Sequence, residues 1–347
     1  MKAERIACLI AGRNLGDIVI ANGLLRYLVE HNYAEHYLVW TRPHMAFMFQ
    51  ELPNCEVVCS PFPIGTRKEF DFPGILAWLR AAKYIRSRRP SVSLDFVGDL
   101  RERIFARTIG SGRHIHIGWA QYHPFHNLIR NPLGQGTPLV TVPKTVPNVY
   151  EACELMLREL VDNRGPWGSP WASKADDKTF RELKSYHIGL HPFASQASKL
   201  WPRERWLSLA RQLLANGCIL TAFSAPGERN HLEEIFSELS SSMIMISGTI
   251  QEFFNAVSRL DLLIGLDSFS VHLAQRAGVR SIMINAGSPP ELWRVPSGVT
   301  LAASGGCKRY PCYNVAPCLG TNYENVCINA IAVSDVLAAI EKMRRGA

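Results

Sequence analysis

The stretch Gly265-Leu266-Asp267-Ser268-Phe269-Ser270-Val271-His272-Leu273-Ala274 has the pattern of a strand, a tight turn and a helix start. An apolar run from Leu262 to Leu266 is typical of a buried strand, and apolar residues recur with helical spacing after the Asp-Ser pair. The first turn of a helix has free N–H groups and the positive end of the helix dipole, so this turn favours an anion. The alternative is an ordinary N-cap, because Asp and Ser are preferred capping residues.

Short apolar strands alternate with helical segments along the whole chain, and this order predicts parallel sheets with helices on both faces. The first half has expected strands at 6–11, 37–40, 55–59 and 92–96 and expected helices at 18–30, 43–51, 75–87 and 101–109. The second half has expected strands at 187–191, 218–223, 243–246, 262–266 and 281–285 and expected helices at 203–216, 228–239, 250–258, 270–277 and 334–345. Trp201 and Trp206 are expected to pack between helix and sheet.

A chain of 347 residues is long enough for two domains. We expect two Rossmann-like doubly wound α/β domains at 1–165 and 186–347, joined by a Gly- and Pro-containing linker at 166–185. The final helix packs either on its own domain or back on the N-terminal domain. Tandem domains of this kind bind ligands at the carboxyl ends of their strands, in a cleft between them.

The composition, with 47% hydrophobic and 20% charged residues, is that of a soluble globular protein. No apolar run reaches the roughly 18 residues that span a bilayer. The apolar segment 6–11 is shorter than a signal-peptide core, so we expect a cytoplasmic protein.

The formal net charge is +8, and part of it is concentrated in two clusters. Such clusters suit an anionic partner, which could be a phosphorylated sugar, an acidic lipid surface or a nucleic acid; a solvated basic face is the alternative. No zinc-finger, RNA-recognition or helix-turn-helix pattern favours nucleic acid. The cluster residues are Lys83, Arg86, Arg88 and Arg89, and Arg101, Arg103, Arg107 and Arg113.

Polar residues follow several of the expected strands. Asp17, at a helix start, is either a first-turn acid stabilised by the helix dipole or a carboxylate that accepts a proton from an attacking hydroxyl. Lys199, before Trp201-Pro202, is suited to hold a phosphate as a compact positive charge, or it is a surface lysine beside a packed tryptophan. Glu228 binds ribose hydroxyls or merely begins a helix. The loop after the first expected strand, which contains Asp17, lacks both the dinucleotide-binding glycine pattern and a Walker motif.

These segments together resemble glycosyltransferase family 9, the ADP-heptose:lipopolysaccharide heptosyltransferases. The matching motifs appear along nearly the whole chain in the family's order. They are Gly16-Asp17, Asp95-Phe-Val-Gly98-Asp99-Leu100-Arg101, His191-Pro-Phe-Ala-Ser195 with Lys199-Leu-Trp201-Pro202, Gly227-Glu228, and Asp267-Ser268-Phe269-Ser-Val-His272.

The resemblance implies a GT-B fold, with the acceptor bound by the N-terminal domain and an ADP-sugar bound by the C-terminal domain. It further implies an inverting transfer that needs no metal or other cofactor. Asp17 would be the general base, and Arg13, Asn14 and Arg101 would face the anionic acceptor. The donor-binding residues would be Ser195, Lys199, Glu228, Asp267, Ser268, Phe269 and His272.

The family usually has glycine where this chain has Phe193 and Phe269. Glycine lets the backbone approach a diphosphate closely, which a phenylalanine hinders. One hypothesis is that the two rings meet across the cleft and reshape the sugar pocket. The alternative is that they close the site.

Cys307, Cys312, Cys318 and Cys327 form a Cys-x4-Cys-x5-Cys-x8-Cys pattern. Four thiolates could hold zinc or iron, but the pattern lacks the Cys-x2-Cys pair of many zinc sites. Reduced cysteines on a surface loop are therefore the preferred interpretation.

The sequence thus predicts a cytoplasmic GT-B glycosyltransferase that moves a heptose or related sugar from an ADP-sugar to a lipopolysaccharide or related glycan, with peripheral contact at the inner membrane face. Two alternatives stay open. One is a non-catalytic protein that binds a sugar nucleotide or glycan, and the other is a nucleotide-sugar epimerase of the same fold.

Overall fold

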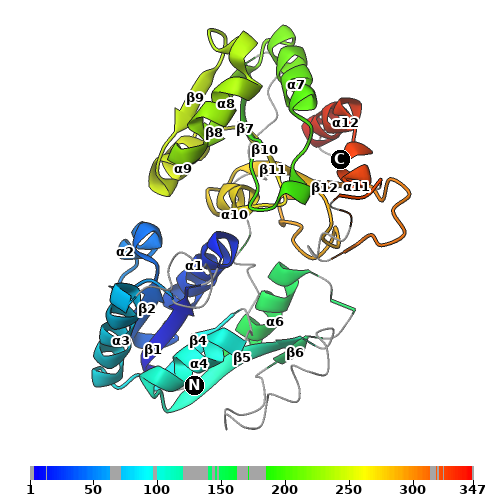
Figure 1. Ribbon diagram of the computed structural model, residues 1–347. Helices are drawn as coiled ribbons and strands as arrows, with labels where there is room; N and C mark the ends of the chain where they lie inside the picture. The colour runs from blue at the N-terminus through cyan, green and yellow to red at the C-terminus, as the bar shows by residue number, and fades with distance from the viewer. Residues whose placement is uncertain are drawn as a thin grey trace. The chain divides into compact units, whose positions relative to one another are not determined.

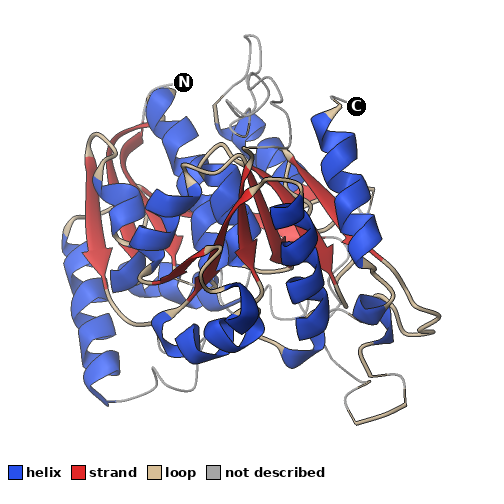
Figure 2. Cartoon of the chain, turned by 90° about the horizontal axis from the view of Figure 1, so that it is seen from above, coloured by secondary structure: helices blue, strands red, loops and turns tan. Residues whose placement is uncertain are grey.

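The computed structural model of the chain describes residues 4–12, 14–62, 72–96, 100–119, 140–142, 145–146, 148–161, 171, 185–312, 318, 320–322 and 324–345. The chain divides into two compact units, Met1–Pro170 and Trp171–Ala347. Figures 1 and 2 show helices packed on both faces of parallel strands, which confirms the predicted α/β class.

The described strands of the first unit form a six-stranded sheet in the order β3-β2-β1-β4-β5-β6. All neighbouring strands are parallel. The strands are β1 (Glu4–Ala11), β2 (Ala34–Thr41), β3 (Cys55–Cys59), β4 (Val92–Asp95), β5 (Arg113–Trp119) and β6 (Val140–Val142). The helices are α1 (Leu15–Glu30), the 3-10 helix η1 (Pro43–Met45), α2 (Phe47–Gln50), α3 (Phe72–Ser87), α4 (Leu100–Ile109) and α6 (Val149–Leu160).

An aromatic cluster fills one face of this first sheet. The indole ring of Trp40 lies 5.2 Å from the ring of Phe62 and 5.9 Å from that of Phe105. Trp78 of α3 stacks on Trp40 with ring centroids 5.7 Å apart. These contacts hold α3 and α4 against the strands with large apolar rings, each of which removes much surface from water.

The second unit repeats the arrangement with the order β12-β11-β10-β7-β8-β9, again with parallel neighbours. Its strands are β7 (His187–His191), β8 (Ile219–Ser224), β9 (Ile244–Ser247), β10 (Leu262–Leu266), β11 (Arg280–Asn285) and β12 (Gly298–Ala302). Its α-helices are α7 (Arg203–Ala215), α8 (Arg229–Ile235), α9 (Ile250–Val257), α10 (Phe269–Arg276), α11 (Val326–Asn329) and α12 (Val333–Arg344). Its 3-10 helices are η4 (Ala197–Lys199), η5 (Pro226–Glu228) and η6 (Ser237–Leu239).

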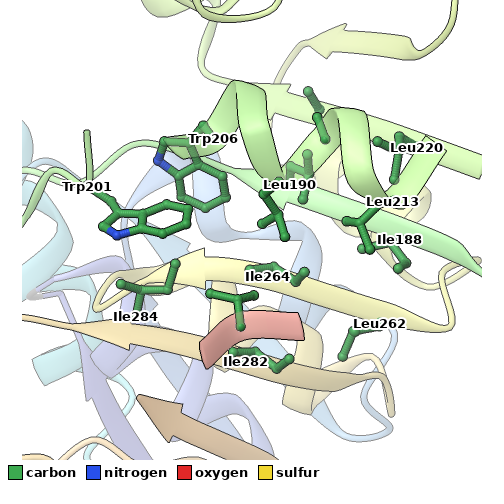
Figure 3. Close-up of a cluster of buried hydrophobic side chains, with 14 of the residues drawn as sticks. Ile188, Leu190, Trp201, Trp206, Leu213, Leu220, Leu262, Ile264, Ile282 and Ile284 are labelled. Carbon is green, nitrogen blue, oxygen red and sulfur yellow. The ribbon is translucent and has the colours of Figure 1, made fainter. Parts of the chain in front are cut away.

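The core of the second unit lies between α7, α12 and the central strands (Figure 3). Trp201 and Trp206 are buried there, edge to face, with ring centroids 5.2 Å apart, as the sequence predicted. The indole N–H of Trp201 donates to the carbonyl of Ile331 at 2.9 Å. The final helix, α12, packs on α7, β11 and β12 of its own unit.

Both sheets have the strand order 3-2-1-4-5-6 when each unit is numbered from its own first strand. The chain therefore reverses direction between β1 and β4 in the first unit, and between β7 and β10 in the second. Ligands of doubly wound proteins bind outside the carboxyl ends of the strands at such a reversal. Among the described residues, no helix is long and apolar enough to cross a membrane.

Candidate functional site

The reversal point of the second unit gathers several of the residues that the sequence analysis singled out. His191 is the last residue of β7, and Asp267 directly follows the neighbouring strand β10. Because the two strands are parallel, their carboxyl ends meet at the same edge of the sheet. The loop after β7 and the turn after β10 therefore converge there.

Lys199 and Asp267 form a buried ion pair at this edge. The Nζ atom of Lys199 lies 2.7 Å from Oδ2 of Asp267, and the side chains are 10% and 6% exposed. The same ammonium also donates to the backbone carbonyl of Asp267 at 3.3 Å. Ser288 donates from its hydroxyl to Oδ2 of Asp267 at 2.6 Å. The alternative of a surface lysine is thus wrong, because Lys199 is buried and charge-paired.

The N-terminus of α10 is not closed by its capping side chain. Ser268 stands at the N-cap with extended backbone angles but accepts no hydrogen bond from the first turn. Its hydroxyl lies 3.0 Å from that of Ser270 instead. Thr249, at the start of α9, is a contrasting case, since its hydroxyl accepts from the N–H of Glu252; α1, α7 and α12 lack such a cap, as α10 does. The α10 N-terminus therefore keeps its first-turn amides free of side-chain capping, as an anion site requires.

His272 lies in the second turn of α10, buried close to the ion pair. Burial lowers the pKa of its imidazole to about 4, with a smaller opposing effect from Asp267 and a smaller lowering effect from Lys199. The ring is therefore neutral at neutral pH, and it packs edge-on near Trp293 with centroids 6.0 Å apart. It adds a polar but uncharged group to the site.

Three aromatic rings pack against His191, and a fourth ring packs behind one of them. Phe253 stacks on it with ring centroids 5.2 Å apart, and Phe193 and Phe269 approach it edge-on at 6.0 and 5.6 Å. The fourth ring, Phe223, stacks on Phe253 at 4.6 Å. Both phenylalanines that stand at the family's glycine positions thus belong to one unit and pack against His191, so the expectation that they meet across a cleft is wrong.

The other residues that the resemblance assigns to the donor are placed as follows. Ser195 is exposed in the loop after β7. Glu228 ends η5 and accepts a hydrogen bond from the backbone N–H of Ala225 at 3.1 Å, which is a helix-starting role. This contact engages one carboxylate oxygen of Glu228.

In the first unit, Asp17 is in the first turn of α1, just after β1. Asn14 donates from its side-chain amide to Oδ2 of Asp17 at 3.0 Å. Asp95 ends β4, the strand beside β1, and is fully buried. Arg13 lies outside the described residues, and for Arg101 the structure gives only its place in the first turn of α4.

Two residues of the site were missed by the sequence analysis. Ser288 holds Asp267, and Asn285, three residues earlier at the end of β11, donates to the carbonyl of Ser288 at 2.8 Å. The signal was present, because Asn285-Ala-Gly-Ser288 is another polar stretch directly after an apolar strand.

The four late cysteines, Cys307, Cys312, Cys318 and Cys327, carry free thiols and are half-buried. Burial raises the pKa of the Cys327 thiol, and the nearby thiols of Cys307 and Cys312 raise it further. Within the described part of the chain, no three His, Cys, Asp or Glu side chains are grouped to hold a metal ion.

Residues 154–319, which include the ion pair, the α10 turn and the loop after β7, match the family model "Glycosyltransferase family 9 (heptosyltransferase)". The resemblance to glycosyltransferase family 9 is confirmed. The matched segment is somewhat less than half of the chain and contains the residues expected to bind the donor, whereas Asp17 and Arg101 precede it. No curated protein matches the chain by sequence.

Solved heptosyltransferase-like structures share the fold over nearly their full lengths. A family 9 glycosyltransferase from Veillonella parvula DSM 2008 is 15% identical with a TM-score of 0.71, over 100% of this chain and 99% of that one. The E. coli heptosyltransferase WaaC, solved with ADP-2-deoxy-2-fluoro heptose, is 10% identical with a TM-score of 0.70, over 97% and 99%. The E. coli ADP-heptose lipopolysaccharide heptosyltransferase II is 14% identical with a TM-score of 0.66, over 99% of each chain. The predicted GT-B fold is therefore confirmed for this chain.

Proposed function

We propose that this glycosyltransferase moves a heptose from ADP-heptose to a lipopolysaccharide or related glycan, with inversion at the anomeric carbon and no metal ion. The observation that supports it most is the buried Lys199–Asp267 pair beside the uncapped N-terminus of α10. An ammonium group and a helix N-terminus without a side-chain cap, at one sheet edge, match the needs of a diphosphate.

On the donor side, Lys199 and the α10 amides would bind the diphosphate of the ADP-sugar. Negative charge grows on the departing ADP as the glycosidic bond breaks, and donors fixed in advance stabilise that charge without reorganisation. Asp267 and Ser288 would keep the Lys199 ammonium in place. Ser195 would contact a phosphate, Glu228 the adenosine ribose, and His272 the donor beside the ion pair.

On the acceptor side, Asp17 would take the proton from the attacking hydroxyl. The hydroxyl oxygen then forms the new bond to the anomeric carbon while the bond to ADP breaks, which inverts that carbon. Asn14, which donates to Oδ2 of Asp17, would orient the carboxylate so that its other oxygen faces the acceptor. Arg13 and Arg101 would face the anionic groups of the acceptor.

Two variants separate donor binding from chemistry. We expect Asp17→Asn to abolish transfer while ADP binding, measured by calorimetry, stays unchanged. We expect Lys199→Ala to lose both. Transfer by Asp17→Asn at the wild-type rate would refute the general-base role, and transfer that stops with a chelator would refute metal independence.

A calorimetric panel of nucleotides and nucleotide-sugars tests the donor. Binding of ADP and ADP-heptose, lost in Lys199→Ala, would support the proposal. Binding of another nucleotide in place of ADP would retain a glycosyltransferase but overturn the heptose donor.

A second candidate is a non-catalytic protein that binds a sugar nucleotide. The observation that favours it is the packing of Phe193 and Phe269 around His191, close to the turn between β10 and α10. Transfer activity that depends on Asp17 would exclude it.

A further inference from the structure

The helix α3 has two contrasting faces. One face is buried where the helix packs on α4 and β3, and its buried residues are Gly74, Ala81, Ala82 and Ile85. At about 100° per residue, Phe72, Leu76, Leu79, Lys83 and Arg86 fall within roughly 80° of one another on the opposite side. We call these five residues the outer stripe of α3.

The first half of the outer stripe is apolar and exposed. Seven large hydrophobic side chains are strongly exposed in the part of the chain that the structure describes, and four of them are on α3. Phe72 is 73% exposed, Leu79 is 48% and Leu76 is 36%, and Tyr84 beside the stripe is 43% exposed. Single exposed apolar residues are normal on a protein surface, but a contiguous group of them marks a binding surface.

The second half of the stripe and the turn after it are basic. The exposed cations are Arg80, Lys83, Arg86, Arg88 and Arg89. No Asp or Glu occurs between Phe72 and Leu94. Arg88 pairs with Glu56 of β3 at 3.2 Å, with both side chains partly exposed. The helix therefore presents exposed aromatic and aliphatic side chains next to a strongly positive surface.

From this combination we infer that the outer stripe of α3 docks on an anionic lipid bilayer. Helices that lie in a membrane interface have an apolar side that enters the acyl boundary and Lys or Arg residues that reach the phosphates. A second copy of this chain fits this surface less well, because its own α3 carries the same cations and no acidic residue that could pair with them. The helix α3 of 16 residues would lie on the surface rather than span the bilayer.

The inference uses no donor, acceptor or catalytic residue, so it stands or falls separately from the proposed transfer. It would bring a lipid-linked glycan to the unit that carries Asp17. Figure 1 shows α3 at the edge of the first unit, beside α2 and the β2 side of the sheet.

The experiment is co-sedimentation of the full chain with two kinds of vesicles, pure phosphatidylcholine and phosphatidylcholine with about one third phosphatidylglycerol. We expect binding only to the anionic vesicles, weakened by added salt. Each cation near an anionic surface raises the partition coefficient onto the vesicles by about fivefold. The double variant Arg80→Glu, Lys83→Glu should therefore lower this coefficient by about 25-fold or more. Phe72→Ser with Leu79→Ser should also weaken binding, at low and at high salt.

Matched changes in the second unit serve as controls. Ile219→Ser with Ile244→Ser removes two side chains that are 50% and 51% exposed, and Lys308→Glu with Arg309→Glu reverses two exposed charges. These variants should sediment like the unchanged chain, and circular dichroism should show all variants folded.

Two results would overturn the inference. One is no binding to anionic vesicles, or equal binding by the α3 variants and the controls. The other is a dimer in sedimentation velocity that Phe72→Ser with Leu79→Ser dissociates while vesicle binding is absent, which would make the stripe a contact between copies.

Discussion

The ammonium of Lys199 lies 2.7 Å from the carboxylate of Asp267, and this pair is buried at the carboxyl ends of β7 and β10. A buried ion pair offers little net stability against an apolar pair of similar volume, because both charges must leave water. Removing one partner is costly, since the other charge is left buried. Net stability is therefore a weak explanation for the pair, which is consistent with the ligand-binding role proposed above.

We predict that Lys199→Met lowers the free energy of unfolding by about 3 to 5 kcal/mol, because the buried carboxylate of Asp267 loses its charge partner and keeps only a neutral hydrogen-bond donor in Ser288. Adding Asp267→Leu should restore most of this loss, while ADP affinity stays lost in both variants. Urea unfolding and calorimetry measure the two properties. Arg229→Met is the control, since its ion pair with Glu233 is exposed and should contribute about 0.5 kcal/mol or less.

Either of two outcomes would contradict this explanation. If the double variant is as unstable as Lys199→Met, the unpaired charge is not what destabilises it. If the double variant binds ADP like the unchanged chain, Lys199 does not hold the phosphate.

A second prediction concerns the start of α10. Thr249→Ala should lower the free energy of unfolding by about 1 kcal/mol, because the hydroxyl of Thr249 caps α9. Ser268→Ala should cost less than half of that, since Ser268 caps nothing in α10. Both residues lie in the same unit, so one thermal or urea unfolding series compares them. Equal losses would mean that Ser268 is an ordinary cap in solution.

Much of the second unit could be predicted from the sequence because its strands are short apolar runs that end at polar turns. The expected strands at 187–191 and 262–266 coincide with β7 and β10. The missed strands have weaker patterns. β5 alternates basic residues with apolar ones, as in Arg113-His-Ile-His-Ile, and reads as part of a charge cluster. β12, Gly298–Ala302, is a short edge strand of mixed composition.

The site could be predicted only in part, for a similar reason. Lys199 and Asp267 stand at motif positions, but their contact joins residues 68 positions apart and depends on how the strands pair. Ser288 was missed because it has no helix pattern after it. The packing of Phe193 and Phe269 on His191 likewise follows from strand order, which no local pattern gives.

A third prediction tests the ring at the first position of α10. Phe269→Gly removes the ring that packs on His191 and Phe253, and opens space beside the turn between β10 and α10. If the ring limits the sugar pocket, the ratio of kcat/KM for ADP-heptose over that for a smaller ADP-hexose should rise by about tenfold, the effect of one to two methylene-sized groups in a pocket. Phe269→Leu, which keeps most of the apolar volume, is the control for stability. Unchanged transfer and unchanged ADP affinity in Phe269→Gly would show that the ring does not shape the donor site.

The last prediction concerns the two buried histidines of the second unit. Burial among aromatic rings lowers the pKa of His191 to about 3, from an ordinary value of 6.5. The unfolded chain therefore binds a proton at pH values where the folded chain does not, so stability is full above pH 6.5 and falls as the pH drops toward 3. For His191 the loss between pH 7 and pH 5 is about 2 kcal/mol. His272, with its pKa lowered to about 4, contributes in the same direction.

We therefore expect the unfolding free energy of His191→Leu to fall by about 2 kcal/mol less than that of the unchanged chain between pH 7 and pH 5. Urea unfolding at both values, followed by tryptophan fluorescence, measures it. His231→Leu, at an exposed position of α8, should keep the full loss. If His191→Leu also keeps the full loss, then His191 accepts its proton in the folded chain, and the aromatic rings around it do not exclude water as the structure indicates.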